Sequence, residues 1–240
     1  MRTSKWLRFL SFAAALAVAV GSTLHPAAGG QNDPKTAWNQ IYDTPGYIFG
    51  TEPIPFLVEN LQLVRPGKAL ELAMGEGRNA VYLAEQGFQV TGVDISEVAA
   101  EKCRRLAAKH NVQIEIIIAD LREYKIPPNT YDLITNLYFP QPDLIPKIKA
   151  GLKPGGFIMY EQWRPVREGQ GFPGESSGAG SGGNVYQYSD LGREELLSQF
   201  RDYRIHLYRE AILNHAATAG PGRGILMSEV MSLIAQKPFD

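Results

Sequence analysis

Two glycines and an acid have the spacing of a nucleoside-binding site. Gly75 and Gly77 lie within residues 68–80, which read as a short buried strand, a tight turn and the start of a helix. Glycines take backbone angles closed to other residues and leave room for a ligand, and N–H groups at a helix start point into such a turn. Asp94 stands 19 residues beyond Gly75 (94 − 75 = 19) at the end of the next predicted strand, where an acid binds the hydroxyl pair of a ribose.

A third predicted strand, residues 112–119, also ends at an acid, Asp120. Glycine pairs alone are common in ordinary turns, but three successive strands that each lead to a polar residue favour a nucleoside pocket. The spacing Gly75-x-Gly77-x-x-Ala80 fits a nicotinamide oxidoreductase as well. That alternative accounts for the first acid and leaves Asp120 unexplained.

The elements that must position these residues alternate between strand and helix. This alternation predicts an α/β fold with a Rossmann-like, doubly wound and mostly parallel sheet. All carboxyl ends of its parallel strands meet at one edge, where a ligand binds. The last two of seven predicted strands form a C-terminal antiparallel hairpin, because residues 214–224 are few for a crossover helix. The strands are expected at residues 68–74, 88–94, 112–119, 131–137, 157–162, 203–212 and 225–236, the helices at 79–86, 97–110, 142–152 and 191–200, and a turn at 153–156.

Composition fits one globular domain. The 240 residues are 44% hydrophobic and 20% charged, which supplies enough apolar material for a full core. The net charge is −1 and the isoelectric point about 6.4, so no electrostatic footprint for nucleic acid is present. One predicted helix carries a cluster of cations, which we interpret as a solvated face and not as a phosphate site. They are Lys102, Arg104, Arg105 and Lys109.

Residues 1–30 have the composition of a secretory signal peptide. Arg2, Lys5 and Arg8 precede an apolar, alanine-rich run over residues 9–20, and small residues follow. The run is shorter than the roughly 20 apolar residues of a membrane span. We therefore expect export to the periplasm or outside the cell, with no membrane span after cleavage. The alternatives are an uncleaved anchor, an organellar transit peptide, or a downstream start that leaves a cytoplasmic protein.

Two segments outside the alternating pattern are candidate covers of the pocket. An aromatic arm precedes the first strand, and it is predicted either to dock as packing or to cover the pocket with Tyr47 or Phe49 facing the ligand. Residues 169–183 contain seven glycines in fifteen positions, which cannot pack a core. We expect a mobile lid at residues 166–189, with a plain flexible linker as the alternative. The chain divides into the signal peptide at 1–30, the arm at 31–66 and the main domain at 67–240.

The single cysteine and the four histidines indicate no redox or metal chemistry. Cys103 has no partner for an internal disulfide and shares a helix face with Ala99 and Leu106, which predicts a packed core thiol. The histidines lack metal-ligand spacing. His110 ends a predicted helix, and His206 alternates with apolar residues in a predicted strand. No metal site is predicted.

Taken together, six segments resemble the class I S-adenosylmethionine-dependent methyltransferases, and most closely the small tellurite-resistance-like branch. They span about residues 38–160, and a hairpin ending belongs to the fold of that family. The segments are Tyr47-x-Phe49-Gly50-Thr51-x-Pro53, Leu70-Glu71-Leu72-Ala73-x-Gly75-Glu76-Gly77-Arg78-Asn79-Ala80, Val90-Thr91-Gly92-Val93-Asp94-Ile95-Ser96, Ala119-Asp120-Leu121, Tyr131-Asp132-Leu133-Ile134 and Leu152-Lys153-Pro154-Gly155-Gly156.

The resemblance implies which residues hold S-adenosylmethionine. Glu71 and the backbone of Gly75 and Gly77 would hold its methionine end, and Asp94 would take the ribose hydroxyls. Carboxylates suit these places because the ligand presents donors there. S-adenosylmethionine has no pyrophosphate, so the glycine turn would serve close approach and not anion capture.

The adenine end is assigned in the same way. Ile95 would pack on the ring, Asp120 would accept from the adenine amine, and the Leu121 N–H would donate to the ring. Asn136, at the end of the fourth strand, would contact the methionine ammonium or the acceptor. These positions all follow strand ends at the predicted ligand edge.

The implied reaction is methyl transfer to a small, soft nucleophile such as a thiol or a metalloid oxyanion. Displacement at an activated sulfonium needs mainly alignment and exclusion of water, so no catalytic base is assigned. Tyr138, Trp163 and Arg164 follow strand ends at the same edge and are the acceptor-side candidates. For the last two residues, anchoring the lid is the alternative role. The alternative function is an exported, non-catalytic module that binds a nucleoside-like or other small ligand.

Three features depart from the family pattern. Met74 stands where the branch often has a cysteine, and the glycine-rich segment is longer than expected. The signal peptide also conflicts with a cofactor that is made in the cytosol.

Overall fold

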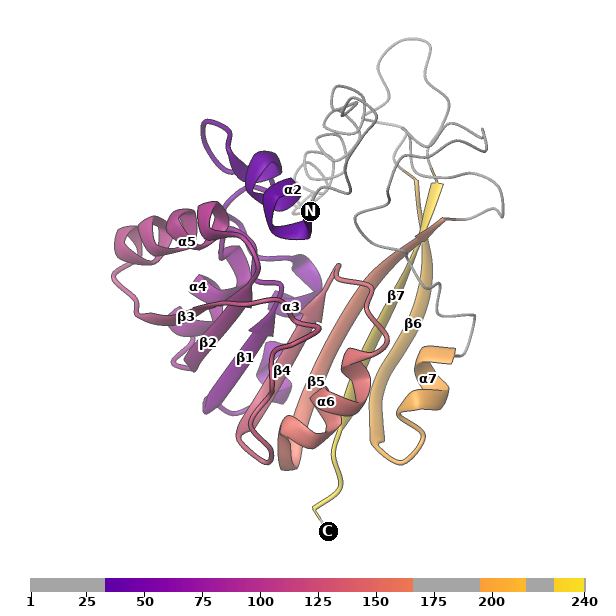
Figure 1. Ribbon diagram of the computed structural model, residues 1–240. Coiled ribbons are helices and arrows are strands. Elements are labelled where there is room, and N and C mark those ends of the chain that lie inside the picture. The colour runs from indigo at the N-terminus through magenta and orange to yellow at the C-terminus, as the bar shows by residue number, and fades with distance from the viewer. Residues whose placement is uncertain (1–32, 166–194, 215–226, 240) are drawn as a thin grey trace, which may run out of the picture.

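A computed structural model describes residues 33–165, 195–214 and 227–239 (Figure 1). Helices and strands alternate along the first of these ranges, as predicted. The elements are α2 (Pro34–Tyr42), α3 (Pro55–Asn60), the 3₁₀ helix η2 (Leu61–Leu63), β1 (Lys68–Leu72), α4 (Arg78–Glu85), β2 (Gln89–Asp94), α5 (Glu97–Lys109), β3 (Ile114–Ile118), β4 (Tyr131–Leu137), α6 (Leu144–Gly151), β5 (Leu152–Pro165), α7 (Glu195–Gln199), β6 (Arg204–Asn214) and β7 (Met227–Gln236).

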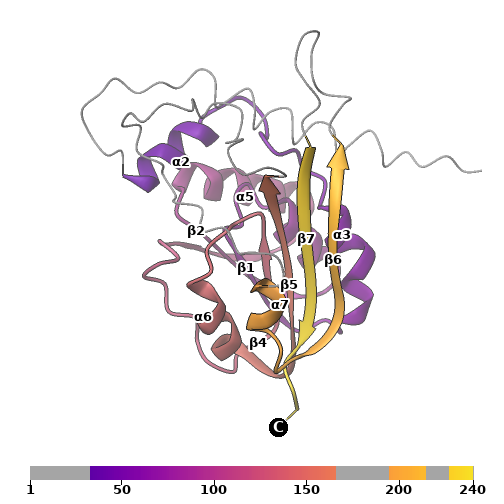
Figure 2. The ribbon, with the colours of Figure 1, turned by 90° about the vertical axis from the view of Figure 1, so that its right-hand side faces the viewer.

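Seven strands form one sheet in the order β3-β2-β1-β4-β5-β7-β6. The first five are parallel neighbours, whereas β7 runs antiparallel to both β5 and β6. Figure 2 shows β7 between these two strands. The predicted fold class, a mostly parallel seven-stranded sheet with an antiparallel C-terminal hairpin, is confirmed.

Helices cover both faces of the sheet. Leu70 and Leu72 of β1 point into a core that includes residues of α6 and α7. Ala69, on the opposite face, packs in a second core with residues of α3 and α4. On α5, Cys103 is fully buried against Met74, so the predicted core thiol is confirmed. Both faces of the sheet are thus apolar, as expected for parallel strands.

The strand order reverses at β1, which lies between β2 and β4. At such a switch point the loops leave the sheet toward opposite faces and open a crevice beyond the carboxyl ends of the strands. The arm helix α2 lies at this carboxyl edge (Figure 1). Helix α5 starts there with Ser96 as its N-cap, whose Oγ accepts from the Ala99 N–H at 3.1 Å.

Several element boundaries differ from the sequence-based expectation, among them the starts of β5 and α6. The predicted turn at residues 153–156 belongs to β5, which pairs with β4 from Leu152 onward through a shift in register. Gly155 makes this shift feasible with a φ of +76°, and its N–H donates to the Lys237 carbonyl at 3.0 Å. Helix α6 begins at Leu144, two residues after the predicted start. The predicted signal peptide at 1–30 and the lid at 166–189 lie outside the described residues.

Candidate functional site at the carboxyl edge

The turn between β1 and α4 is closely enclosed. Gly75 and Gly77 have φ angles of +55° and +88°, which favour glycine. A Cβ atom on Gly77 would lie 2.2 Å from Cys103 Sγ of α5, and one on Gly75 would lie 2.9 Å from Tyr42 Oη of α2. Glycine is therefore required at both positions, because the backbone angle and the neighbouring side chains leave no room for a side chain.

Asp94 ties this turn to the one that follows β2. Its Oδ2 accepts from the Gly75 N–H and its Oδ1 from the Ser96 N–H, both at 2.8 Å. Burial raises the pKa of the carboxyl, and these backbone hydrogen bonds act in the opposite direction. Each carboxylate oxygen keeps a further lone pair, so Asp94 has acceptor capacity left for a ligand hydroxyl.

Glu71 of β1 is a buried acid with one unmatched oxygen. Its Oε1 accepts from Asn79 Nδ2 at 3.0 Å, whereas its Oε2 has no hydrogen-bond partner in residues 33–165, 195–214 and 227–239. Burial raises the pKa of Glu71 to about 8, against the hydrogen bond from Asn79. Because buried polar atoms are normally paired, this oxygen indicates a site for a donor such as an ammonium group.

Asn136 at the end of β4 adds a second unmatched group. The residue is 1% exposed, and neither Oδ1 nor Nδ2 has a hydrogen-bond partner within the part of the chain that the structure describes. Tyr160, its register neighbour on β5, is also 1% exposed and has an unpartnered hydroxyl. An orphan amide and an orphan hydroxyl side by side can accept from and donate to one ligand.

Tyr138 follows β4 with a φ of +62°, a left-handed conformation that costs a bulky residue about 1–3 kcal/mol. Its hydroxyl donates to Glu161 Oε1 of β5 at 2.6 Å, and Ser232 Oγ of β7 donates to Glu161 Oε2 at 2.8 Å. Burial raises the pKa of Glu161. Sequence analysis missed this acid, although an acid within the apolar run of β5 was a visible signal.

The residues assigned to adenine occupy the end of β2 and the segment after β3. Asp120 is held by Arg122 through its guanidinium and its backbone N–H, the latter at 2.8 Å. The hydrogen bonds from Arg122 lower the pKa of Asp120. Leu121 is buried in the core and Ile95 is half-buried. Their roles toward adenine stay predictions.

One cation assigned to a solvated face is instead buried, so that prediction is wrong for Lys102. Its Nζ lies 2.8 Å from Glu76 Oε1, and the two side chains are 6% and 2% exposed. Arg104 does lie at the surface, with 49% of its side chain exposed. Packing of α5 on the glycine turn explains the difference, because it brings Lys102 against the residue between the two glycines.

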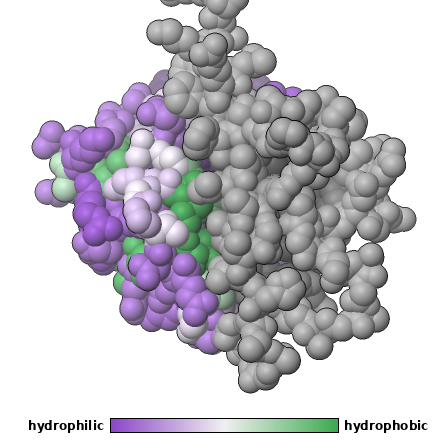
Figure 3. Space-filling view, turned by 90° about the horizontal axis from the view of Figure 1, so that it is seen from above, coloured by the Kyte–Doolittle hydropathy of each residue, from purple (hydrophilic) through white to green (hydrophobic). Residues whose placement is uncertain are grey.

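The predicted site residues lie at one edge of the sheet. The side chains of two of them, Trp163 and Arg164, are not described by the structure. Figure 3 views this edge from above, where apolar and polar side chains alternate over its described part. Trp163 and Arg164 lie in β5, where their backbones pair with Val230 and Glu229 of β7. Their side chains lie outside the described part of the molecule, so their acceptor-side role stays a prediction.

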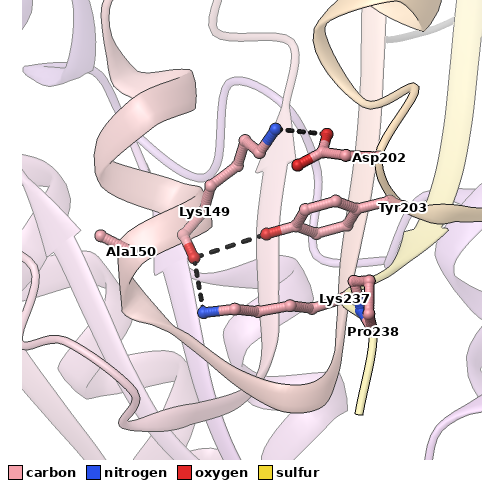
Figure 4. Close-up of a pocket in the computed structure, with 6 residues that line it drawn as sticks. All are labelled: Lys149, Ala150, Asp202, Tyr203, Lys237 and Pro238. Atoms are coloured by element: carbon pink, nitrogen blue, oxygen red, sulfur yellow. Dashed lines mark hydrogen bonds and ion pairs between the residues drawn. The ribbon is translucent and has the colours of Figure 1, made fainter. Parts of the chain in front are cut away.

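A pocket lies at the other end of the sheet, away from the glycine turn. Figure 4 shows its lining, in which Lys149, Tyr203 and Lys237 meet. Tyr203 Oη and Lys237 Nζ donate to the Lys149 carbonyl at 3.4 and 3.0 Å, and Lys149 Nζ pairs with Asp202 at 2.6 Å. These contacts satisfy the last carbonyls of α6, which is a structural role.

The described residues show neither a metal site nor a membrane-spanning helix. Within the described ranges, no group of three His, Cys, Asp or Glu side chains is placed to hold a metal ion. In those ranges no helix is both long and apolar enough to cross a membrane.

Comparisons with known proteins agree with this geometry. Residues 69–156 match the family model described as "Methyltransferase domain". The probable S-adenosyl-L-methionine-dependent methyltransferase TehB of Haemophilus influenzae is 26% identical over 109 residues, 43% of this chain and 38% of that protein. The ubiquinone biosynthesis O-methyltransferase of Idiomarina loihiensis is 36% identical over 101 residues, 39% of this chain and 41% of that protein. Hemagglutinin 1 of Eikenella corrodens is 26% identical over 187 residues, 75% of this chain and 58% of that protein.

The alignments thus span less than two thirds of each of these relatives. Among solved structures, the crystal structure of TehB from Haemophilus influenzae superposes with a TM-score of 0.62 at 20% identity, over 85% of this chain and 67% of that one. The [4+2]-cyclase SpnF superposes with a TM-score of 0.55 at 16% identity, over 97% and 96%. At these identities the structural likeness establishes the fold alone.

The site also fits the cofactor of this fold on its own terms. Gly75 and Gly77 keep side chains out of the turn, and buried carboxylates stand at the ends of β1 and β2. Glu71 Oε2 and the amide of Asn136, which lack hydrogen-bond partners among the described residues, are free to bind polar groups of a ligand. The chain therefore has the fold of the class I S-adenosylmethionine-dependent methyltransferases, matches a methyltransferase domain over residues 69–156, and is similar to TehB.

Proposed function

We propose that the chain transfers a methyl group from S-adenosylmethionine to a small, soft nucleophile such as a thiol or a metalloid oxyanion. The observation that carries the proposal is a set of buried, incompletely paired polar groups in neighbouring strands, namely Glu71 of β1, Asn136 of β4 and Tyr160 of β5. Unpaired buried groups cost about 1–3 kcal/mol each, and a bound polar ligand relieves that cost.

The cofactor-binding residues act by position and charge. Glu71 Oε2 accepts from the methionine ammonium, and the turn at Gly75 and Gly77 lets the ligand approach the backbone. Asp94 accepts from the ribose hydroxyls with its free lone pairs. When bound, S-adenosylmethionine supplies a methyl group already activated on a sulfonium. Ile95, Asp120 and Leu121 hold the adenine, as the resemblance implies.

The acceptor lies on the side of the site formed by β4 and β5. Asn136 orients a polar group of the acceptor or the methionine ammonium, and Tyr138 presents its ring beside it, with Trp163 and Arg164 as further candidates. The hydroxyl of Tyr138 is fixed by Glu161. Alignment of this kind can supply roughly 7–11 kcal/mol of the barrier, so an anionic acceptor requires no dedicated base.

For a protonated acceptor such as a thiol, the Tyr138–Glu161 pair is the available proton acceptor. As the acceptor's sulfur takes the methyl group, the bond from the methyl carbon to the sulfonium would break and leave S-adenosylhomocysteine, and the thiol proton would pass to Tyr138 Oη while the phenol proton moves to Glu161 Oε1. The short hydrogen bond of 2.6 Å provides the path. Burial raises the pKa of Glu161, which makes it a better recipient of a proton than an exposed carboxylate.

The proposed function is tested first by calorimetric titration of the full-length chain with S-adenosylmethionine and S-adenosylhomocysteine. We expect micromolar binding that is lost in Asp94→Asn, which keeps the size of the side chain but removes its charge. Methyl transfer is then measured as S-adenosylhomocysteine formation with thiol, tellurite and selenite probes. Binding without turnover on any probe would refute the soft-nucleophile acceptor, and absence of binding would refute the cofactor assignment as well.

The alternative of a non-catalytic binding module is not favoured, because the complete set of cofactor positions is retained. We further propose that residues 1–30 direct export. Fractionation of the native host with mass spectrometry of the N-terminus tests this. A mature protein that starts near residue 31 in the exported fraction is expected, and an intact N-terminus in the cytosol would contradict it.

A further inference from the structure

The N-terminal arm is held by the side chains of the glycine turn itself. Phe49 is gripped at both of its main-chain groups: its N–H donates to Glu76 Oε2 at 3.3 Å, and its carbonyl accepts from Arg78 Nη1 at 2.8 Å. Glu76 and Arg78 flank Gly77, so both contacts come from the segment that shapes the pocket. Tyr42 Oη of the same arm lies beside Gly75.

The grip is anchored by buried charge. Lys102 of α5 pairs with Glu76 Oε1 at 2.8 Å, which neutralises the carboxylate and leaves its other oxygen for Phe49. Tyr47 Oη donates to the Lys102 carbonyl at 3.1 Å. A buried ion pair of this kind fixes geometry more than it adds stability.

Two further contacts place the arm across both turns of the site. Asn79 Oδ1 accepts from the Ile54 N–H at 3.0 Å, while its Nδ2 donates to Glu71. Asn39 of α2 accepts from Ser96 Oγ at 2.7 Å. The arm is thus joined to the residues that follow β1 and to those that follow β2.

Sequence analysis left open whether the arm is packing or cover. The contacts described above make it both, since Tyr47 packs on the helices while the backbone at Phe49 crosses the glycine turn. A ligand bound at the glycine turn lies next to Glu76 and Arg78, which hold the backbone of Phe49. Docking of the arm and binding of the ligand therefore act on the same residues.

Building on the proposed function, we propose that the arm is a cover whose docking is coupled to cofactor binding, with Arg78 and Glu76 as positioning residues that transmit the coupling. The bound cofactor holds the turn in the shape that grips Phe49, and the docked arm slows release of the cofactor. Such a coupling is reciprocal.

The test combines hydrogen exchange with calorimetry on the full-length chain, with S-adenosylhomocysteine as the probe. In the wild type, the probe should slow amide exchange in residues 43–54. Arg78→Met should raise exchange in that segment without the probe and weaken binding about tenfold, within the usual range of coupling between two sites. Arg78→Lys keeps a donor and should restore part of both effects.

Asn39→Ala provides a second variant that changes no atom of the glycine turn. It should raise exchange in the arm and weaken binding in the same direction, by a smaller factor. Arg104→Met is the matched control, because Arg104 is an exposed arginine that pairs with Glu101 of the same helix, away from the arm. It should change neither readout.

If the wild type binds S-adenosylhomocysteine but amide exchange in residues 43–54 is the same with and without it, the coupling is wrong while the proposed function stands. Raised exchange in Arg78→Met with wild-type affinity would overturn it too, since the arm would then be mere packing. If the wild type binds neither S-adenosylmethionine nor S-adenosylhomocysteine, the proposed function and the coupling both fail. Exchange throughout β1 and α4 is monitored as a check that Arg78→Met remains folded.

Discussion

The two edges of the sheet treat their buried polar groups in opposite ways. At the amino edge Lys237 Nζ donates to Lys149 and Leu152 carbonyls and to Asn129 Oδ1, at 3.0, 2.7 and 3.2 Å. At the carboxyl edge, the buried amide of Asn136 has no hydrogen-bond partner among the described residues. The described polar groups of the amino edge are thus paired within the protein, whereas this amide is not.

Backbone strain follows the same division. Four described residues other than glycine have a positive φ, and the two at the amino edge, Asn111 and Asn129, are asparagines that tolerate it. The two at the carboxyl edge are Ala73 and Tyr138, with φ of +53° and +62°. These residue types take the left-handed conformation at a cost. Backbone strain and unpaired polar groups thus occur together at the carboxyl edge, where the candidate site lies.

The largest effect is expected from Asp94→Ala, which removes both acceptors that hold the turns. Two buried N–H groups, of Gly75 and Ser96, would lose their partners. We expect the free energy of unfolding to fall by about 3 kcal/mol and binding of S-adenosylhomocysteine to be lost. Urea unfolding and calorimetry measure the two effects. If the folded variant bound S-adenosylhomocysteine with wild-type affinity, the ligand would not depend on the buried carboxylate of Asp94.

Gly77→Ala should lower the free energy of unfolding by about 2–3 kcal/mol, because it adds a steric clash to an unfavourable φ. The added Cβ would meet Cys103 Sγ at 2.2 Å. Gly46→Ala is the control, since Gly46 has a φ of +78° but open space around it. Urea unfolding of both variants separates the two contributions, and equal losses would show that packing of α5 on the turn is unimportant.

At the amino edge, Lys237→Met should cost about 1–2 kcal/mol of unfolding free energy, because buried carbonyls at the end of α6 lose their donor. It should leave the affinity for S-adenosylhomocysteine unchanged, since the residue lies at the opposite edge. Thermal unfolding and calorimetry on one preparation test both statements. A loss of affinity without a loss of stability would reverse the division between the edges.

The smallest effect concerns the pH dependence of stability. Burial raises the pKa of Glu71 from 4.5 to about 8, so the folded state binds a proton that the unfolded state has released between these values. The free energy of unfolding therefore falls as pH rises through this window. Glu71→Gln should remove that slope, so that its gain in stability over the wild type is larger at pH 8 than at pH 5. Urea titrations at pH 5 and pH 8 without ligand decide, and parallel slopes would contradict the assignment.

Local patterns explain why most of the fold could be predicted. The apolar alternation of Leu70 and Leu72, the glycine turn and the Ser96 cap each depend on neighbours in the chain. The burial of Lys102 could not be predicted in this way, because its partner Glu76 is 26 residues away and meets it only after α5 packs. The role of Glu161 was hidden for the same reason, since β7 supplies Ser232.

The position of β7 has a consequence for how the protein is made. It is the last of the seven strands along the chain, yet it lies between β5 and β6 in the sheet. During synthesis, β5 and β6 emerge before the strand that pairs with both of them, so the sheet cannot be completed until residue 236 is available. A chaperone that acts on the growing chain would therefore meet one unpaired edge of β5 and both unpaired edges of β6 until β7 is available.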